Sequence, residues 1–278
     1  MRAIPRVSQF QFKYFQKLTR KKYREQEKRF LIEGTKLVHE VLQSDWKLET
    51  LLLHRDFLMT ESARDILRLA EAVHCELLEV SSDELKKLSD TVTPQSIIGV
   101  VASRPQLLDS VLTGDAHRCL VIALDDVADP GNVGTILRTC DWFGVDAVVL
   151  SKSSVEIFNP KVVRSAMGSL FHLPICTDAD FPSVLKLAKR NGFEIIATVI
   201  EGGRMLPAID FAAKTVMVFG NEAHGVSPEI TQLADQLMTI PKHGRAESLN
   251  VAIASGVAIG YWQMTSPMHH AGVKDRLP

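Results

Sequence analysis

The sequence lacks the residue patterns that mark secreted, membrane-spanning and metal-binding proteins. It has no C-x-x-C pair and no histidine cluster at metal-ligand spacing, and its four cysteines are Cys75, Cys119, Cys140 and Cys176. Residues 1–11 contain no apolar core of the kind found in signal peptides, and no apolar run approaches the length of a membrane span. We therefore expect a reduced, cytoplasmic protein with no bound metal and no membrane segment.

The sequence also lacks the loops of several common nucleotide-binding and hydrolytic enzymes. No G-x-G-x-x-G follows an expected strand, which argues against a Rossmann dinucleotide site and against a Rossmann-type methyltransferase. There is no G-x-x-x-x-G-K-[ST] loop of a P-loop NTPase and no G-x-S-x-G element of an α/β-hydrolase. The formal net charge is −1, so the whole-chain charge does not indicate a nucleic-acid partner.

One segment near the N-terminus departs from this even charge balance. Residues 13–29 carry an excess of about six positive charges, because Glu25 and Glu27 are their only acidic residues. Aromatic side chains lie among the basic ones, a combination that suits phosphates and exposed bases. The predicted RNA contacts are Lys13, Lys17, Arg20, Lys21, Lys22 and Arg24. The alternative is a solvated helix face with a few aromatic side chains turned inward.

Alternating helix and strand patterns divide the chain into two α/β domains joined by a linker. We predict a small N-terminal domain over residues 1–105, a loop-like linker over 106–118 and a second domain over 119–278. The strands predicted in the first domain are 48–53, 77–80 and 97–102, and its helices include 37–42, 66–73 and 84–88. Ser81 and Glu84 are predicted to form a capping box at the start of the last of these helices.

The second domain has the pattern of a parallel sheet covered by helices on both faces. Continuous Val, Ile and Leu runs separated by helices are typical of such sheets. The predicted strands are 119–125, 146–151, 194–200, 215–220 and 236–240. The predicted helices are 132–143, 160–171, 181–191, 228–235 and 248–264.

Three polar, glycine-bearing segments follow strands of the second domain. In an open parallel sheet, ligands bind outside the carboxyl ends of the strands, so these segments form a site if their strands are neighbours. Their candidate functional residues are Asn132 and Arg138 in the first segment, Glu222 in the second, and Ser248 and Asn250 in the third. Asn132 is also placed to cap the helix that follows it.

These segments resemble the three sequence motifs of the SpoU (TrmH) family of RNA 2′-O-methyltransferases, within the SPOUT superfamily. The resemblance covers roughly residues 119–264. The matching residues are Asp129-Pro130-Gly131-Asn132-Val133-Gly134 with Arg138, then Gly220-Asn221-Glu222 with Gly225, then Ile240-Pro241 with Ser248-Leu249-Asn250. The N-terminal domain resembles the small RNA-binding domain that many family members carry.

The resemblance implies an enzyme that uses S-adenosylmethionine to methylate a ribose 2′-hydroxyl. It further implies a C-terminal trefoil knot, a rare exception to unknotted topology, and a homodimer with the active site near the subunit interface. The implied catalytic residues are Arg138, Asn132, Glu222, Ser248 and Asn250, and the implied cofactor-binding residues are Gly220, Ile240, Leu249 and Thr198. Because a guanidinium keeps its proton, Arg138 suits a phosphate clamp better than a general base, and the proton acceptor stays open.

Several alternatives remain at this point. The separate N-terminal domain favours ribosomal RNA over transfer RNA as substrate, because it resembles the domain of rRNA-modifying relatives. A non-catalytic RNA-binding protein of the same fold and a nucleotide-using enzyme of another class are the rival functions. For Arg138, the rival is a surface ion pair with Asp141 or another nearby acidic residue.

Overall fold

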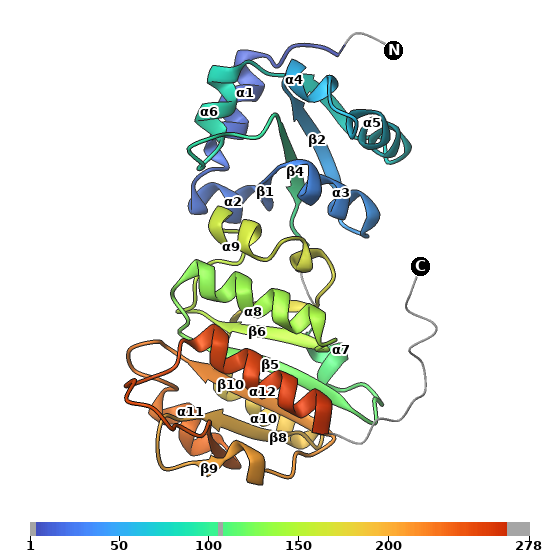
Figure 1. The fold of residues 1–278 in the computed structure, drawn as a ribbon. Helices are drawn as coiled ribbons and strands as arrows, with labels where there is room; N and C mark the ends of the chain where they lie inside the picture. The colour runs from blue at the N-terminus through green and yellow to red at the C-terminus, as the bar shows by residue number, and fades with distance from the viewer. Residues whose placement is uncertain (1–3, 105–107, 266–278) are drawn as a thin grey trace.

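The computed structural model describes residues 4–104 and 108–265. Its helices and strands form two α/β units, each built on its own sheet, with the N-terminal unit stacked on one end of the second (Figure 1). Within these ranges no helix is long and apolar enough to cross a membrane.

The N-terminal unit is built on a four-stranded mixed sheet with the order β1-β4-β2-β3. Strand β4 is antiparallel to β1 and β2, whereas β3 is parallel to β2. The strands are β1 (Arg29–Glu33), β2 (Leu48–Leu53), β3 (Glu76–Glu79) and β4 (Ile97–Ala102). The helices are α1 (Gln9–Lys17), α2 (Lys21–Glu27), α3 (Thr35–Gln43), α4 (Arg55–Leu58), α5 (Ala63–Ala72) and α6 (Ser82–Leu88). The predicted capping box between Ser81 and Glu84 is confirmed at the start of α6.

The second unit is built on a seven-stranded sheet with the order β7-β6-β5-β10-β8-β11-β9, and every pairing in it is parallel. The strands are β5 (Cys119–Asp125), β6 (Ala147–Ser151), β7 (Ile175–Ala179), β8 (Glu194–Thr198), β9 (Arg204–Met205), β10 (Lys214–Gly220) and β11 (Gln236–Thr239). Every residue of β5 and β6 is buried, because helices cover both faces of the sheet.

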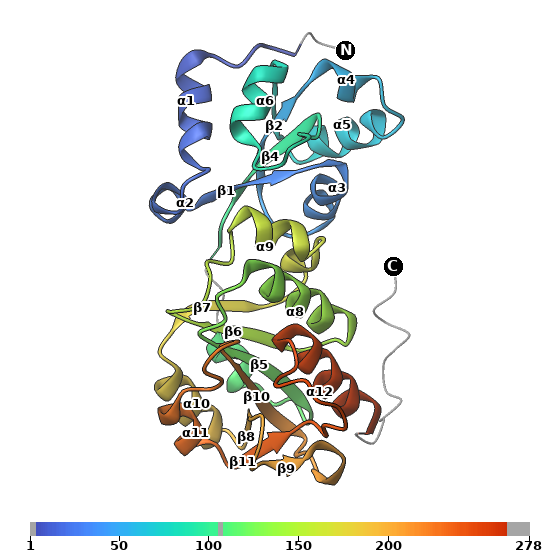
Figure 2. The same ribbon diagram turned by 60° about the vertical axis from the view of Figure 1, so that its left-hand side comes forward.

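Helices lie on both sides of this sheet. Helices α8 (Pro130–Trp142) and α12 (Val251–Thr265) pack side by side on one face, and α10 (Phe181–Arg190) and α11 (Pro228–Leu233) cover the other (Figure 2). The remaining helices are α7 (Leu108–Leu112), α9 (Pro160–Ser165) and the 3-10 helices η1 (Ser169–Phe171) and η2 (Leu206–Ala208). The predicted parallel α/β sheet is confirmed, and the trefoil knot stays a prediction.

Some elements differ from the prediction. The expected helix 160–171 is divided into α9 and η1, because Met167 and Gly168 have φ values of +54° and +104°, which end a right-handed helix. Helix α7 lies inside the segment expected to be a loop-like linker. Strands β7 and β9, at the two edges of the sheet, were not expected.

Aromatic side chains join the two units. Phe30 of β1 stacks on Phe158 with 4.4 Å between ring centroids. Trp46 contacts Phe158 and Phe171 edge-on, at 6.3 and 5.6 Å. A single hydrophobic cluster therefore extends from the first sheet into the second unit, and it fixes the N-terminal unit against the sheet that carries the candidate site.

Candidate active site

The strands that precede the three predicted loops are neighbours in the second sheet. Strand β10 lies between β5 and β8, and β11 lies on the other side of β8. Gly220, the last residue of β10, pairs with Asp125, the last residue of β5. Thr198, the last residue of β8, pairs with Met238 near the end of β11. Because these strands are parallel, the segments that follow them all leave the sheet at the carboxyl ends of the strands, as predicted. This side of the sheet is called the carboxyl edge below.

Three polar side chains connect these loops. The Nδ2 atom of Asn132 donates a hydrogen bond to Oε1 of Glu222 at 2.7 Å. The Nδ2 atom of Asn250 donates to Oδ1 of Asn132 at 3.0 Å. The network therefore brings together one residue from each of the three segments. Glu222 and Asn250 are exposed and Asn132 is partly exposed, so a ligand at the carboxyl edge can reach all three.

Asp129, rather than Asn132, caps helix α8. Its side chain accepts a hydrogen bond from the Asn132 N–H at 2.9 Å, and Pro130 occupies the first helical turn. The predicted capping role of Asn132 was wrong, because Asn132 lies inside the first turn and its amide is free to bond Glu222. The hydrogen bond from the Asn132 N–H lowers the pKa of the Asp129 carboxyl below its usual value, and the nearby Lys161 ammonium lowers it further.

Asn250 positions the start of helix α12. Its Oδ1 accepts hydrogen bonds from the N–H groups of Ala252 at 2.9 Å and Ile253 at 3.3 Å. The helix consequently begins at Val251 instead of the predicted residue 248. One side chain thus caps α12 and bonds Asn132 on α8, which fixes the two helices of this face relative to each other.

The side chain of Asn221, to which the sequence alone assigned no role, shapes the second loop. Its Oδ1 accepts hydrogen bonds from the N–H groups of Ala223 at 2.8 Å and His224 at 3.3 Å. Its Nδ2 donates to the carbonyl of Asp126 at 2.8 Å, which ties this loop to the first segment. The signal in the sequence is an Asn in a glycine-bearing turn, since Asn side chains commonly organise such turns.

Arg138 is exposed on α8 and makes no hydrogen bond or ion pair with any described residue. The alternative ion pair with Asp141 is absent, because Asp141 Oδ2 contacts His172 Nδ1 at 3.0 Å. Ser248 is also exposed and forms no hydrogen bond within the part of the chain that the structure describes. The structure therefore leaves these two predicted residues outside the network and open to solvent.

The residues expected to hold a cofactor border the carboxyl edge. Gly220 is buried, Ile240 is partly buried and Leu249 is 49% exposed. The Thr198 hydroxyl donates to the Val218 carbonyl at 3.0 Å. The loop 241–249 forms no hydrogen bond with residues 4–104 or 108–265, so its backbone donors and acceptors are available to a polar ligand.

The described part of the chain holds no metal-ligand cluster, and three of its four cysteines are buried. No group of three or more His, Cys, Asp or Glu side chains there is arranged to hold a metal ion. Burial raises the pKa of the thiols of Cys75 and Cys119 to about 12 and raises the pKa of Cys140 as well. These three buried cysteines are therefore protonated at neutral pH and unreactive.

Five of the six predicted RNA-binding residues are exposed on α1, α2 and the turn between them, and these are Lys13, Lys17, Arg20, Lys21 and Lys22. Arg24 differs, because its side chain is only 5% exposed. Its Nε donates to Glu156 Oε1 at 2.8 Å, and its Nη1 donates to the Leu18 carbonyl at 3.0 Å. Arg24 is thus a buried link between the two units and is not accessible to RNA, and RNA contact by the other five residues stays a prediction.

Two family models match this chain. The SpoU rRNA Methylase family matches residues 119–260, and the MRM3-like substrate binding domain matches residues 10–99. Among curated proteins, the chain is 33% identical over 259 residues to the 23S rRNA (guanosine(2553)-2′-O)-methyltransferase RlmP of Bacillus subtilis. That alignment covers 93% of this chain and 98% of the relative.

Solved structures show the same fold. The AdoMet-bound rRNA methyltransferase from Sinorhizobium meliloti superposes with a TM-score of 0.83 at 29% identity, covering 95% of this chain and 98% of that one. The SpoU methyltransferase AviRb from Streptomyces viridochromogenes, in complex with AdoMet, gives 0.83 at 26% identity over 92% of this chain and 98% of that one. The sequence motifs, the matched family models and the shared fold agree, and the chain belongs to the SpoU rRNA methylase family.

Proposed function

We propose that this protein transfers a methyl group from S-adenosylmethionine to a ribose 2′-hydroxyl of ribosomal RNA. The observation that carries this proposal is the network of Asn132, Glu222 and Asn250, which lies at the carboxyl edge in a member of the SpoU family. Relatives that align over most of the chain are named 23S rRNA 2′-O-methyltransferases. Ribosomal RNA is therefore favoured over transfer RNA as the substrate.

The reaction places two demands on the protein. Displacement of a methyl group by a hydroxyl requires the reacting atoms to be held in line and water to be kept out. S-adenosylmethionine supplies the electrophilic methyl group. The protein has to position the ribose and stabilise the negative charge that develops on its 2′-oxygen.

Arg138 is suited to the second demand. Its guanidinium has no partner among the described residues, so it is available to a phosphate beside the reacting ribose and to the developing oxyanion. It lies six residues beyond Asn132, which corresponds to about 9 Å along α8. By fixing the first turn of this helix, Asn132, Glu222 and Asn250 position Arg138, and the exposed hydroxyl of Ser248 is available to the ribose or phosphate.

The residues at the carboxyl edge fit the cofactor. The unpaired backbone groups of loop 241–249 supply hydrogen-bond donors and acceptors for an adenosyl moiety and an amino acid moiety. The half-exposed side chain of Leu249 offers apolar surface for a purine. We assign the cofactor to the backbone of Gly220, Ile240 and Leu249, with the Thr198 hydroxyl as a further contact.

We also propose a homodimer that forms through helices α8 and α12. Ile253 and Val257 lie one turn apart on α12 and are 54% and 42% exposed, and Trp142 at the end of α8 is 84% exposed. Exposed apolar side chains on two adjoining helices are typical of an interface. Because Arg138 shares the exposed side of α8 with Trp142, this interface would place the active site at the subunit boundary. Sedimentation equilibrium should give twice the chain mass of 30.8 kDa, and a monomer at micromolar concentration would contradict the proposal.

The N-terminal unit is proposed to bind the RNA. The five exposed basic residues of α1, α2 and their turn are available to phosphates, and Lys17 lies 5.7 Å from the centroid of the Tyr23 ring. We place the enzyme in the cytoplasm, where thiols remain reduced.

The proposed reaction is tested with Arg138→Ala. We expect this variant to bind S-adenosylmethionine as the wild type does, measured by calorimetry, and to lose about 10²-fold or more in methyl transfer to unmodified ribosomal RNA. Full turnover by the variant would remove Arg138 from the mechanism. Wild-type protein that binds RNA but neither binds S-adenosylmethionine nor transfers its methyl group would instead be a silent RNA-binding member of the fold.

A further inference from the structure

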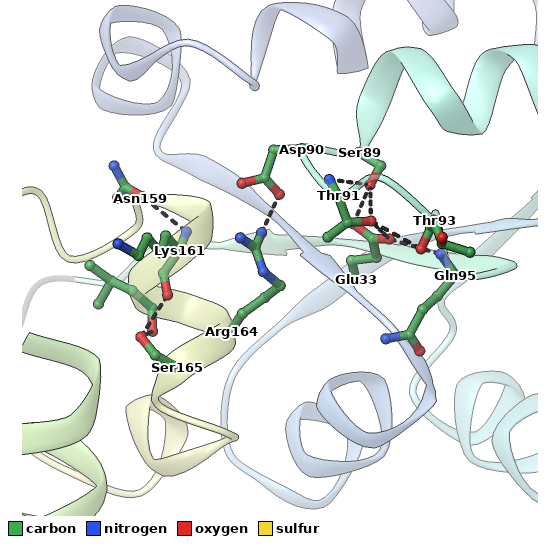
Figure 3. A network of polar contacts seen from close by, with 11 residues as sticks. Glu33, Ser89, Asp90, Thr91, Thr93, Gln95, Asn159, Lys161, Arg164 and Ser165 are labelled. Carbon is green, nitrogen blue, oxygen red and sulfur yellow. Dashed lines mark hydrogen bonds and ion pairs between the residues drawn. The ribbon is translucent and has the colours of Figure 1, made fainter. Parts of the chain in front are cut away.

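The short helix α9 lies between the two units and carries two cations that reach in different directions. The Nζ atom of Lys161 lies 3.4 Å from Asp129 Oδ2, at the start of the active-site helix α8. Arg164, one turn later, forms an ion pair with Asp90 of the N-terminal unit (Figure 3). One turn of helix therefore connects the edge of the active site to the RNA-binding unit.

The loop that carries Asp90 is held in place by Glu33. The Glu33 carboxylate accepts hydrogen bonds from the Ser89 hydroxyl at 2.7 Å, the Thr91 hydroxyl at 3.1 Å and the Gln95 N–H at 2.8 Å (Figure 3). These bonds lie on both sides of Asp90 in the sequence. The Asp90 carboxylate is thus presented to Arg164 by a fixed loop.

The ion pair borders a cavity between the units. This cavity has a volume of about 200 Å³, and both Asp90 and Arg164 line it. Lys87 lines it as well and has no ion-pair partner among the described residues. The side chains of Arg164 and Asp90 are 32% and 45% exposed, so a phosphate of a bound RNA can reach the guanidinium.

Resting on the proposed function, we propose that Arg164 binds an RNA phosphate and that Asp90 occupies its guanidinium while RNA is absent. A guanidinium binds carboxylate and phosphate through the same planar pair of N–H groups, so one anion can replace the other. An exposed ion pair contributes little to stability, and little is lost when it opens. Asp90 therefore acts as a competitor built into the protein, and it weakens RNA binding at this point.

This exchange predicts opposite effects for the two partners of one ion pair. Binding of a fluorescein-labelled 20-nucleotide single-stranded RNA is measured by anisotropy at several salt concentrations. Asp90→Asn should bind about threefold more tightly than the wild type, because Arg164 no longer has an internal anion. Arg164→Gln should bind about threefold more weakly, with a salt slope lower by about 0.7 for the lost phosphate contact. In the double variant, the gain from Asp90→Asn should disappear.

A matched control separates this exchange from a general effect of charge. Arg104 and Asp45 form another exposed Arg–Asp pair. Asp45→Asn changes the net charge by the same amount and should leave RNA binding unchanged. Arg164→Lys keeps the charge and should bind between the wild type and Arg164→Gln. The melting temperature of each variant confirms that it is folded.

Two results would overturn the proposal. Weaker or unchanged binding by Asp90→Asn would give the pair a purely structural role, and an equal gain from Asp45→Asn would assign the effect to net charge alone. Methyl transfer by the wild type to unmodified ribosomal RNA is measured in parallel. If the wild type is active but Asp90→Asn and Arg164→Gln do not change RNA binding in opposite directions, only this inference is refuted. If the wild type is inactive, the proposed function is refuted, and the comparison of RNA binding by the variants still tests the exchange between Asp90 and phosphate.

Discussion

Removing Glu156 should destabilise the protein far more than removing any exposed acidic partner. The side chains of Arg24 and Glu156 are only 5% and 11% exposed, and they join the N-terminal unit to the second unit. Glu156→Ala leaves a guanidinium buried with the Leu18 carbonyl as its remaining partner. Breaking a buried ion pair in this way costs about 3–5 kcal/mol, because the remaining charge is neither paired nor hydrated.

The matched control is Glu25→Ala, which removes an exposed ion pair from α2, the helix that also carries Arg24. Lys21 Nζ and Glu25 Oε1 are 3.6 Å apart, and both side chains are more than half exposed. Its loss should cost less than about 0.5 kcal/mol. The double variant Arg24→Met/Glu156→Leu removes both charges and should recover most of the stability, to within about 2 kcal/mol of the wild type.

Urea unfolding measures these differences. Trp46 lies against Phe158 and Phe171 of the other unit, so its fluorescence reports on the boundary once Trp142 and Trp262 have been replaced by phenylalanine in every variant compared. Far-UV circular dichroism reports on the helices. We expect the two signals to change together, because a single hydrophobic cluster spans the boundary. A loss of stability below about 1 kcal/mol for Glu156→Ala, or a loss equal to that of Glu25→Ala, would show that the Arg24–Glu156 pair is not a buried link that stabilises the boundary.

Three further predictions concern local structure. Gly134→Ala should destabilise the protein by about 1–3 kcal/mol in urea unfolding, since the added Cβ would lie 1.9 Å from Ser165 Oγ, and a neutral result would show that α9 shifts freely. Asp129→Ala should cost about 1 kcal/mol at pH 7 through the lost helix cap. The Asn132 N–H lowers the pKa of Asp129, so this loss of unfolding free energy should be fully present above the ordinary carboxyl pKa of about 3.9. It should vanish as the pH falls through the lowered pKa. A loss that does not depend on pH would contradict a cap made by the charged carboxylate. In the native protein, a thiol reagent at neutral pH should label the partly exposed Cys176 well before the three buried cysteines, and rapid labelling of a second thiol would contradict their burial.

The main architecture followed from the sequence because buried parallel strands have a strong local signature. Strands β5 and β10 are continuous apolar runs, and their predicted limits agree with the structure to within a residue. The edge strand β7 (Ile175–Ala179) contains Thr177 and Asp178, and most of its residues are at least partly exposed. It lacks the apolar pattern that the prediction relies on. The division of helix 160–171 depended on a positive φ at Met167, which no helical spacing reveals.

The site was predicted in part for a related reason. The three loops each contain a visible polar and glycine pattern, and the parallel sheet brings them together, so Asn132, Glu222 and Asn250 were found. Contacts between distant segments were missed, such as the hydrogen bond from Asn221 to the Asp126 carbonyl, 95 residues away. Arg24 was predicted to contact RNA like its basic neighbours, because its burial results from the packing of the second unit against the first, which the local sequence does not reveal. Such pairings depend on tertiary structure rather than on local sequence.

The most direct test of ribose 2′-O-methylation by this protein is to locate the methyl group that it transfers. Purified protein is incubated with labelled S-adenosylmethionine and in vitro-transcribed large-subunit ribosomal RNA, and nuclease digestion followed by mass spectrometry identifies the labelled nucleoside. We expect label on a ribose 2′-oxygen at one position, and we expect this label to be lost with Arg138→Ala. Label on a base would exclude ribose methylation, and label that persists in this variant would exclude the role proposed for Arg138.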